Sequence, residues 1–429
     1  MKLPSGPRFP LAALWLLSRA VLLLYTFRVV FVPGPDVTTD VSVIYFDWYQ
    51  VLRGGTYPLD DVTWQYPPAA AFAILSPGLL PFLEYAHAFF VLALVCDAVV
   101  FGLLMYAGGR PGKSHAGAWV WLAGVPLLGP TAYSRYDIMV TAVAVAALLA
   151  GVRNPRTMGV LAGVGALLKV WPALLLAGTA RGRVTRRSGT AAVVSGAAVL
   201  GACVLAAPGA LAFLTFQRDR GTEVESLGSL VFHVARFFGA WDGDVRLNYG
   251  SVEFLGPYVP LVSRAAMALT LLAFAWLVLW RVRAREFGPT ALADAAFVAV
   301  LLFTTTSRVI SPQYMLWLVG LAAVCLVWRG SRMRRPAVLV LVATGVTLLE
   351  FPIWFSHVVA SDGLGLVLLF TRNGLLVAAS LLAARELWRR TVTEPRLREA
   401  AGEGGGDGGG PGARVPAQGA HRDGALLKS

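Results

Sequence analysis

Long apolar runs recur along this chain, and each is about as long as the helix that crosses the hydrocarbon core of a membrane. Residues 10–32 form the first of these runs and residues 364–388 the last. A membrane-spanning α-helix needs roughly 17–25 apolar residues to cross a ~30 Å core, whereas a membrane β-barrel is built from alternating strands of ~10 residues. The chain is 57% hydrophobic and 14% charged, while a soluble domain is about 45–50% apolar and about 25% charged. We therefore predict an all-α polytopic membrane protein.

Arginine and lysine lie in short clusters between the apolar runs, within a chain whose formal net charge is +13. Such clusters are typical of the cytoplasmic loops of multi-pass proteins, so the excess of positive charge does not indicate a nucleic-acid partner. With every cluster placed in the cytoplasm, ten crossings bring both termini to the cytoplasmic side of the plasma membrane. The predicted spans are residues 10–32, 87–107, 116–132, 137–152, 189–207, 258–280, 290–306, 312–328, 336–355 and 364–388.

Two further apolar segments are unsuited to a full crossing. Residues 67–82 are short and broken by prolines, and we expect them to form a juxtamembrane helix on the outer surface. Residues 157–180 have basic clusters on both sides and are interrupted near the middle by Lys169 and Pro172. Each half of about 12 residues would reach ~18 Å as a helix, about half of a bilayer. We predict a re-entrant pair of half-helices, whose broken backbone must be shielded by protein or water.

The apolar runs and the polar segments divide the chain into three parts. Residues 1–9 are predicted to be a cytoplasmic N-terminus, and residues 10–390 a membrane-embedded domain whose first span is an uncleaved anchor. We expect function to reside in its long outer loops, residues 33–66 and 208–257, because long loops usually carry it. Residues 391–429 are rich in glycine and polar side chains. Such a segment cannot bury a core, so we predict a disordered cytoplasmic tail.

The first outer loop combines carboxylates with aromatic rings directly after the first span. Asp40 and Asp47 are seven residues apart, which places them on one face if this stretch is helical. Tyr66 is one of several aromatic residues in the loop, which can contact a substrate or simply anchor the loop at the membrane interface. The carboxylates are either solvated surface acids or residues of an active site.

Lys169 and Arg372 are basic residues inside predicted membrane segments. A charge near the bilayer centre costs at least ~2.5–3.5 kcal/mol on insertion scales. Lys169 should therefore line a cavity, pair with an acid or serve helix packing. Arg372 should bind a partner or an anion.

Two polar stretches lie at the outer ends of spans in the second half of the chain. In "FQRDRGTEVESLGSL", Arg220 and Glu225 belong either to a salt-bridged solvated loop or to a basic fork for phosphate. The second reading rests on the ability of arginine to donate paired hydrogen bonds to phosphate oxygens. In "TTTSRVISPQYMLW", Gln313 and Tyr314 lie at the outer mouth of two spans. The sequence contains no Walker A loop, zinc-ligand spacing or nucleophile elbow.

Four segments, taken together, resemble the family-87 glycosyltransferases of the GT-C superfamily, which include actinobacterial polyprenyl-phosphate-mannose-dependent mannosyltransferases. The resemblance covers most of residues 10–390 and rests on the order and spacing of these segments. They are the Asp-led first loop ending in "YPP" (Asp40 to Pro68), "ALLKVWPALLL" (Ala166 to Leu176), "QRDRGTEVES" (Gln217 to Ser226) and "SPQYMLWL" (Ser311 to Leu318).

The resemblance implies an integral membrane enzyme with its active site on the outer face of the membrane. The expected fold is a GT-C-like bundle of about ten spanning helices with the re-entrant pair and the juxtamembrane helix. The expected reaction moves a hexose, with mannose as the favoured sugar, from a polyprenyl-phosphate donor to a lipid or cell-envelope glycan acceptor. It inverts the anomeric centre without a metal or another cofactor. Membrane lipids are the remaining expected partners.

An aspartate in the first outer loop acts as general base in this family, and Asp40 matches that position. The acceptor hydroxyl is a poor nucleophile until a base takes its proton, and an ionised carboxylate can do so as the new bond forms. The resemblance therefore implies that Asp40 is the catalytic residue.

The leaving phosphate develops negative charge, which a preorganised arginine or lysine should stabilise. Arg220 and Arg372 are the leading candidates, with Lys169 behind them. Some family members carry a His pair where this chain has Gln313 and Tyr314, so the residue that steadies the phosphate stays open. The predicted substrate-binding residues are Asp47, Tyr66, Lys169, Arg220, Glu225, Gln313, Tyr314 and Arg372.

Two other functions remain open at this point. The interrupted segment around Lys169 is also compatible with a secondary transporter or a flippase of lipid-linked saccharides, although the sequence shows no internal repeat of the kind common in transporters. A non-catalytic subunit that binds lipid is the other alternative, because a family fold does not guarantee activity.

Overall fold

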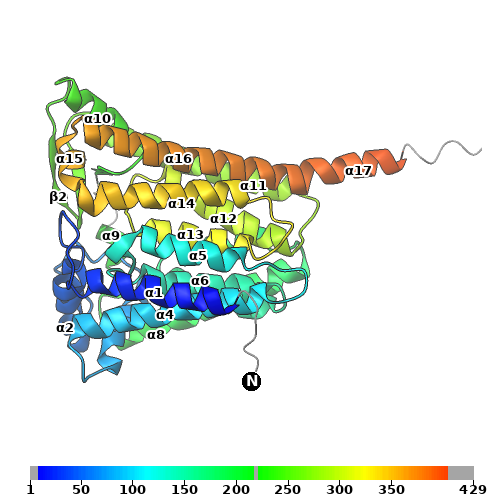
Figure 1. The fold of residues 1–429 in the computed structure, drawn as a ribbon, viewed down its shortest axis with the longest axis horizontal. Coiled ribbons are helices and arrows are strands. Elements are labelled where there is room, and N and C mark those ends of the chain that lie inside the picture. The colour runs from blue at the N-terminus through cyan, green and yellow to red at the C-terminus, as the bar shows by residue number, and fades with distance from the viewer. Residues whose placement is uncertain (1–7, 217–220, 404–429) are drawn as a thin grey trace, which may run out of the picture.

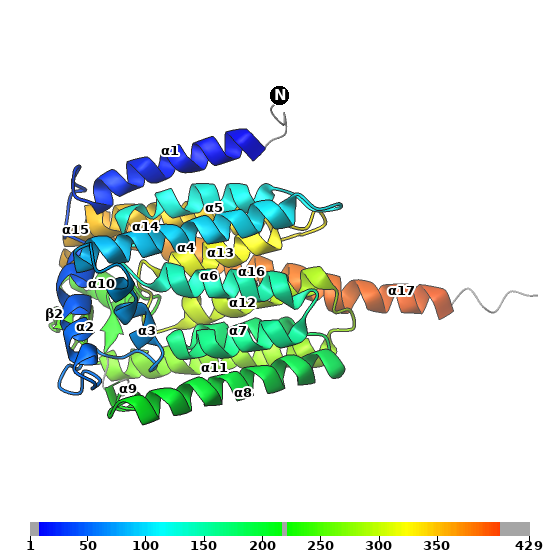
Figure 2. The same ribbon diagram turned by 90° about the horizontal axis from the view of Figure 1, so that it is seen from below.

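The structure, a computed structural model, describes residues 8–216 and 221–403. Its helices run side by side along one axis and form a bundle, with most connecting segments at its two ends (Figure 1, Figure 2). Seven of the described helices are long and apolar enough to cross a membrane, in agreement with the predicted helical, polytopic fold. They are α1 (Arg8–Thr26), α4 (Tyr85–Gly108), α8 (Arg183–Ala206), α11 (Val259–Arg283), α12 (Pro289–Thr306), α14 (Arg334–Leu348) together with the π-helix η5 (Leu349–Ile353) that continues it, and α16 (Gly363–Trp388).

Three of the ten predicted spans form shorter helices that lie among the long ones. At ~1.5 Å per residue, a helix of 12 to 15 residues is shorter than a ~30 Å hydrocarbon core. The predicted runs are therefore helical, but these helices do not span the core by themselves. They are α5 (Ala116–Leu127), which continues as the 3₁₀ turn η3 (Gly129–Ala132), α6 (Asp137–Gly151) and α13 (Tyr314–Cys325).

The predicted re-entrant pair is present. α7 (Pro155–Leu168) ends where Lys169 adopts extended backbone, and the chain continues as the 3₁₀ helix η4 (Trp171–Gly178). η4 packs against both α7 and α12. Arg281, near the C-terminal end of α11, donates a hydrogen bond to the carbonyl oxygen of Ala177. The segment thus turns back near Lys169 instead of crossing.

Residues 67–82 do not cross the bundle either, but they lie deeper than the predicted surface helix. They form α3 (Ala70–Leu75) and the 3₁₀ turn η2 (Ser76–Leu79). α3 packs against α7 and against α2 (Phe46–Arg53). Its small alanine side chains are buried, whereas Phe72 is 53% exposed. Small side chains let helices approach closely, which explains why this segment packs inside the bundle and not on its surface.

A small antiparallel sheet lies at one end of the bundle, where the sequence predicts no strands. The hairpin turns at Tyr249 and Gly250, both of which have positive φ, as a two-residue hairpin turn requires. Together with α2, α10 (Leu230–Phe237) and α15 (Phe355–Ala360), the sheet forms what we call the loop end. Its strands, in hydrogen-bonded order, are β1 (Thr222–Glu223), β3 (Ser251–Leu255) and β2 (Asp244–Asn248).

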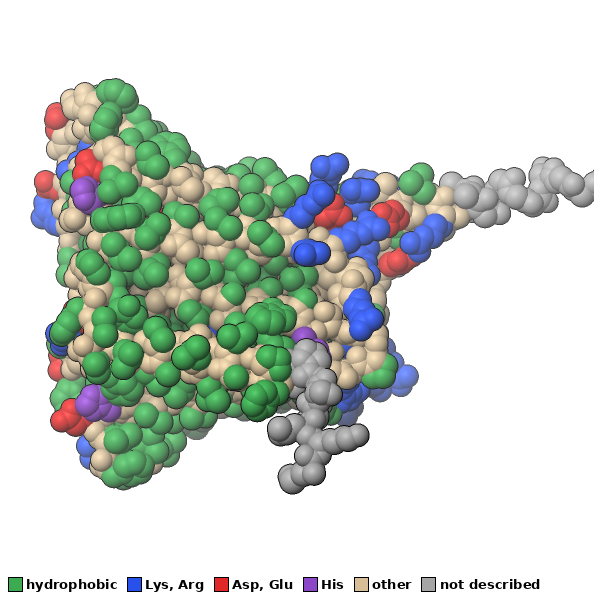
Figure 3. Space-filling model, viewed as in Figure 1, with side chains coloured by type: hydrophobic (Ala, Val, Ile, Leu, Met, Phe, Trp, Pro, Cys, Tyr) green, Lys and Arg blue, Asp and Glu red, His purple; other side chains and the backbone are tan. Residues whose placement is uncertain are grey.

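Lysine and arginine side chains gather at the opposite end, which we call the basic end (Figure 3). From there α16 continues through the π-turn η6 (Arg389–Thr393) into α17 (Glu394–Glu403). This helix replaces the first part of the disordered tail predicted for residues 391–429; residues 404–429 lie outside the described part of the chain. An ion pair of 2.5 Å between Arg332 and Glu394 ties the start of α17 to the bundle.

Candidate active site

Asp40 is the first residue of the short π-helix η1 (Asp40–Tyr45), which leads directly into α2. Its Oδ2 lies 2.5 Å from Nη2 of Arg135, and the Asp40 side chain is 35% exposed. Arg135 also donates hydrogen bonds to the carbonyl oxygens of Val37 (3.1 Å) and Ser134 (2.7 Å). The guanidinium therefore fixes the start of η1 and orients the carboxylate, which stays within reach of solvent.

Lys169, where the re-entrant pair turns back, forms an ion pair with a buried carboxylate. Its Nζ donates a hydrogen bond of 2.7 Å to Oδ1 of Asp137, the first residue of α6. Nε1 of Trp317 donates to the same oxygen at 2.7 Å. The second oxygen of Asp137, Oδ2, is buried and has no hydrogen-bond partner among the described residues. An unsatisfied carboxylate oxygen in a buried site is a strong acceptor for a hydroxyl group.

Aromatic rings surround Lys169 and connect it to Asp40. The Lys169 Nζ lies between 5.1 and 5.5 Å from four ring centroids, those of Tyr66, Tyr136, Tyr314 and Trp317. Tyr136 separates Arg135 from Asp137 in the sequence, and its ring centroid lies 6.1 Å from that of Tyr45 in η1. We call the whole set the polar centre. It consists of Asp40, Tyr45, Tyr66, Arg135, Tyr136, Asp137, Lys169, Tyr314 and Trp317.

The polar centre contains two carboxylates and two cations arranged as two ion pairs. Asp40 is half-buried, whereas Asp137 is almost fully buried. The pair near the surface offers a carboxylate that can accept a proton, and the deeper pair offers an ammonium group and flat aromatic faces. Such faces suit cations and the apolar faces of sugar rings. In residues 8–216 and 221–403, no group of three or more His, Cys, Asp and Glu side chains could hold a metal ion.

Asp47 is one of the predicted site residues that lie outside the polar centre. Asp47 is exposed on α2, and the structure gives its side chain no ion pair or hydrogen bond within the part of the chain that it describes. Residues 40–45 form a π-helix and α2 begins only at Phe46, so the α-helical spacing on which the predicted shared face of Asp40 and Asp47 rests does not apply here. Arg220 lies outside the described residues.

Glu225 and Arg372 meet in a second cluster, near the loop end. Nε and Nη2 of Arg372 donate to the two carboxylate oxygens of Glu350 at 3.0 and 2.5 Å. Nη2 also lies 3.7 Å from Oε1 of Glu225, and all three side chains are buried. Burial raises the pKa of Glu225 well above its usual range, and the nearby carboxylates of Glu350 and Glu223 raise it further. Arg372 thus has a carboxylate partner, and the predicted need for a partner or an anion is met inside the protein.

Gln313 and Tyr314 lie where a polar loop enters α13. Gln313 is half-buried at the N-cap position, and Tyr314 stacks on Trp317 with a centroid distance of 3.9 Å. Glu223 of β1 holds the preceding loop, because its carboxylate accepts hydrogen bonds from the backbone N–H of Ile310 (2.6 Å) and the hydroxyl of Ser311 (3.0 Å). This acid links the sheet to the polar centre.

Sequence reasoning missed several members of the polar centre. Neither Arg135 nor Asp137 was singled out from the sequence, and Trp317 was included only within the predicted span 312–328 and the segment "SPQYMLWL". The signal lies in "SRYD", the four residues from Ser134 to Asp137, which places two opposite charges at the start of an apolar helix. The deeper of these charges needs a partner of opposite sign, and Lys169 is the basic residue placed inside a neighbouring apolar segment.

Comparison with known proteins adds a family match. The family model described as glycosyltransferase family 87 matches residues 64–312, which is more than half of the chain and includes Arg135, Asp137 and Lys169. A crystal structure of ArnT from Cupriavidus metallidurans in the apo state is similar to this chain at 15% sequence identity with a TM-score of 0.46. The similarity covers 91% of this chain and 79% of that chain. No curated protein matches the chain.

Proposed function

The chain belongs to glycosyltransferase family 87, and we propose that it transfers a hexose, specifically mannose, from a polyprenyl-phosphate donor to a lipid or cell-envelope glycan acceptor. The observation that supports this proposal most directly is the placement of Asp40. Its carboxylate is 35% exposed and oriented by Arg135, and a buried ammonium group ringed by aromatic side chains lies in the same cluster. A base at the surface and a cation in the interior are the two groups that such a transfer needs.

Asp40 is the general base in this proposal. The acceptor oxygen forms a bond to the anomeric carbon while the bond from that carbon to the donor phosphate oxygen breaks. The proton of the acceptor hydroxyl passes to Asp40, and the phosphate leaves with the bonding electrons. Attack from the side opposite the phosphate inverts the anomeric centre. Arg135 keeps the carboxylate in place during this step through its own bonds to Val37 and Ser134.

Lys169 is our candidate for stabilising the leaving phosphate. An ammonium group carries three N–H donors, and within the described residues its hydrogen bonds go to Asp137 alone. Arg220 is a second candidate. Arg372 is bound to Glu350, and we therefore assign it a structural role.

The aromatic side of the polar centre supplies the sugar-binding surface in this proposal. The rings of Tyr66 and Tyr314 both face Lys169, where they can stack on the hexose that the phosphate carries. Gln313, next to Tyr314, can exchange hydrogen bonds with sugar hydroxyls. Asp47 is exposed and remains available to bind a hydroxyl of the acceptor.

Asp40→Asn tests this assignment, because asparagine keeps the shape of the side chain and cannot take the proton. We expect transfer of radiolabelled mannose from a polyprenyl-phosphate donor to a lipid extract of the native host to fall by about 10²–10⁴-fold. Asp60→Asn is the matched control, since Asp60 is an exposed acid of the same loop and should retain full activity. Transfer by Asp40→Asn at the rate of the wild-type protein would overturn the assignment of the base.

We place the basic end in the cytoplasm and the polar centre on the outer face of the plasma membrane, because arginine-rich loops stay on the cytoplasmic side. Single cysteines at the two ends test this orientation. Gly330→Cys is exposed at the basic end and Leu247→Cys is exposed on β2, where Leu247 is 74% exposed. The native Cys203 and Cys325 are buried, and the half-buried Cys96 is replaced by alanine in both variants to remove its background.

In intact cells, a membrane-impermeant maleimide should label Leu247→Cys and leave Gly330→Cys unlabelled. After the cells are broken open, both variants should react. If Gly330→Cys were labelled in intact cells and Leu247→Cys were not, the orientation would be the opposite of the one proposed.

A further inference from the structure

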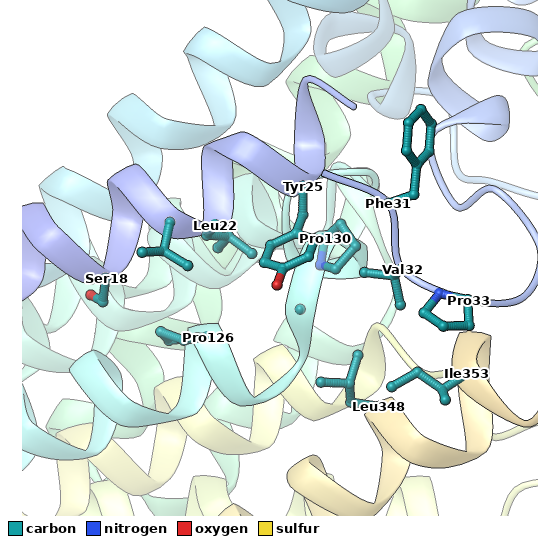
Figure 4. A pocket seen from close by; sticks show the side chains of 12 residues that line it. Ser18, Leu22, Tyr25, Phe31, Val32, Pro33, Pro126, Pro130, Leu348 and Ile353 are labelled. Atoms are coloured by element: carbon teal, nitrogen blue, oxygen red, sulfur yellow. The ribbon is translucent and has the colours of Figure 1, made fainter. Parts of the chain in front are cut away.

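A groove of about 270 Å³ separates α1 from the rest of the bundle near the loop end. Figure 4 shows α1 on one side of the hollow, the α5–η3 segment on the second side and the end of α14 on the third. The lining is largely apolar, and the face of α1 that carries Leu14, Leu17 and Val21 is exposed. An apolar hollow of this kind, open beside the membrane-facing surface of a helix, suits a hydrocarbon chain. Its lining includes Leu22, Val32, Pro126, Pro130, Leu348 and Ile353.

The groove is a fixed feature of the fold, because a buried ion pair holds α1 against the bundle. Nε of Arg19 lies 2.7 Å from Oδ2 of Asp97 in α4, and both side chains are almost fully buried. Arg19 also donates a hydrogen bond of 2.8 Å to the carbonyl oxygen of Leu122 in α5. Two fixed partners on different helices set the distance between α1 and its neighbours at the end of the groove, where Ser18, the residue before Arg19, lines it.

A second hollow of about 220 Å³ continues the groove toward the loop end. The two hollows share Tyr25, Phe31, Val32 and Pro130 in their linings. The second one also has charged side chains in its wall, Arg28 and Asp36, which the first lacks. Thr38 lines the same hollow.

The polar hollow adjoins the polar centre on the side of the proposed base. Val37 lines the hollow, and its carbonyl oxygen accepts the hydrogen bond from Arg135 that fixes the start of η1. Asp40 follows three residues later and binds the same guanidinium. Asp40 is therefore joined to the wall of this hollow through one guanidinium group, whereas Lys169 bonds to Asp137.

We infer that this groove holds the hydrocarbon chain of the acceptor, which is then a membrane lipid with a hydroxyl-bearing head group and not a soluble glycan. The inference rests on the proposed function. In an inverting transfer the base and the leaving phosphate lie on opposite sides of the anomeric carbon, so the ligand that arrives beside Asp40 is the acceptor. Lys169, the candidate for binding the donor phosphate, lines neither hollow.

The charges at the mouth agree with an acceptor head group. Nη1 of Arg28 lies 3.2 Å from Oδ2 of Asp36, so the pair is balanced and offers no net charge to a phosphate. A paired guanidinium and carboxylate still offer donors and acceptors, which hydroxyl groups of a sugar or polyol can use.

Photolabelling tests the occupant without requiring catalysis. The probe is a monoglycosyl diacylglycerol with a diazirine in its acyl chain, added to the full-length protein in phosphatidylcholine nanodiscs. We expect label in peptides that contain Leu22, Val32, Pro126 and Leu348. A lipid extract from the native host should compete with the probe, and polyprenyl phosphate should not.

Leu348→Trp fills the groove, and Val342→Trp is the matched control on the same helix, because Val342 is 49% exposed and does not line the groove. We expect Leu348→Trp to lose most of the label and to raise the KM for the lipid acceptor by about tenfold, the effect of losing one or two buried methylene contacts. The KM for the donor should stay unchanged, and Val342→Trp should behave as the wild-type protein does.

Three outcomes would overturn the inference. They are label spread evenly over the membrane-facing helices, displacement of the probe by polyprenyl phosphate, and an unchanged acceptor KM in Leu348→Trp. A wild-type protein that binds the probe in the groove but transfers no sugar would instead contradict the proposed function. The two failures are therefore distinguishable.

Discussion

Lys169 and Asp137 form an ion pair whose side chains are 11% and 1% exposed. Two charges so far from water hold each other in place, and the removal of one leaves the other uncompensated. The sequence shows that Lys169 interrupts an apolar segment and therefore needs a partner. It does not name Asp137, which is 32 residues away along the chain.

Lys169→Met is expected to lower the free energy of unfolding by about 3–5 kcal/mol, because Asp137 is left buried without a cation. Replacement of both residues, Lys169→Met with Asp137→Leu, should recover part of this loss. Thermal unfolding in detergent micelles provides the measurement. Lys113→Met, at the basic end, serves as the control and should melt near the wild-type temperature. If Lys169→Met also melted there, the ion pair would not stabilise the fold.

Arg372 is a second charged residue whose need for a partner follows from the sequence, although the identity of that partner does not. Its predicted need for a counter-charge is confirmed, and Glu350 supplies that charge. The alternative of a phosphate ligand was equally consistent with the sequence, because a charge inside a span requires compensation without specifying its source. The packing of η5, which follows α14 and carries Glu350, against α16 decided between them.

The contact between α7 and α8 relies on glycine. A Cβ atom at Gly159 would lie 2.1 Å from the carbonyl oxygen of Ser188, and one at Gly163 would lie 2.3 Å from that of Ala192. Gly159 and Gly163 are four residues apart and face α8 together, an arrangement that lets helix backbones approach closely. Any larger side chain at these positions must push the helices apart.

Gly163→Leu is therefore expected to destabilise the protein by about 1–3 kcal/mol or more, the usual cost of overpacking a close contact. Gly201→Leu is the matched control on α8, since a Cβ atom at Gly201 meets nothing within 4 Å. Thermal unfolding and transfer activity should both decline in the first variant alone. Equal behaviour of the two variants would show that α7 and α8 do not pack as described.

At the level of whole elements, the apolar runs predicted the positions of the helices better than their lengths. The ten predicted spans all contain helices, and the break at Lys169 marks the turn of the re-entrant pair. The predicted spans 116–132 and 312–328 are longer than the helices α5 and α13 that they contain, because the turns beside these helices are also apolar. The hairpin of β2 and β3 was missed because its strands have five residues each and lie within a long polar loop.

A buried histidine makes the stability of the loop end depend on pH. Nε2 of His233 bonds to the carbonyl oxygen of Val224 (2.7 Å) and Nδ1 to the hydroxyl of Ser361 (2.8 Å). Burial is the main reason that the pKa of His233 is lowered to about 4, and nearby Arg236 acts in the same direction. In the unfolded chain the imidazole of His233 takes up a proton below about pH 6.5, whereas in the folded protein it takes up that proton only at lower pH.

The stability that neutral His233 provides is complete above about pH 6.5 and is lost as the pH falls toward 4, a total of about 3 kcal/mol. We expect the difference in melting temperature between wild type and His233→Gln to shrink over this range. Thermal unfolding at several pH values measures it. A difference that is constant between pH 7 and pH 4 would contradict the lowered pKa.

The sequence by itself determined that this is a multi-pass helical membrane protein, where its apolar segments lie, which of them is broken and which end is basic. These properties depend on runs of neighbouring residues and on the cost of placing charge in a membrane. It also singled out Asp40 as the candidate base. Only the tertiary structure joined Asp40 to Arg135, paired Lys169 with Asp137, committed Arg372 to Glu350 and opened the groove beside α1. Each of these contacts joins residues that are far apart in the chain, and only the packing of the helices fixes which distant residues meet.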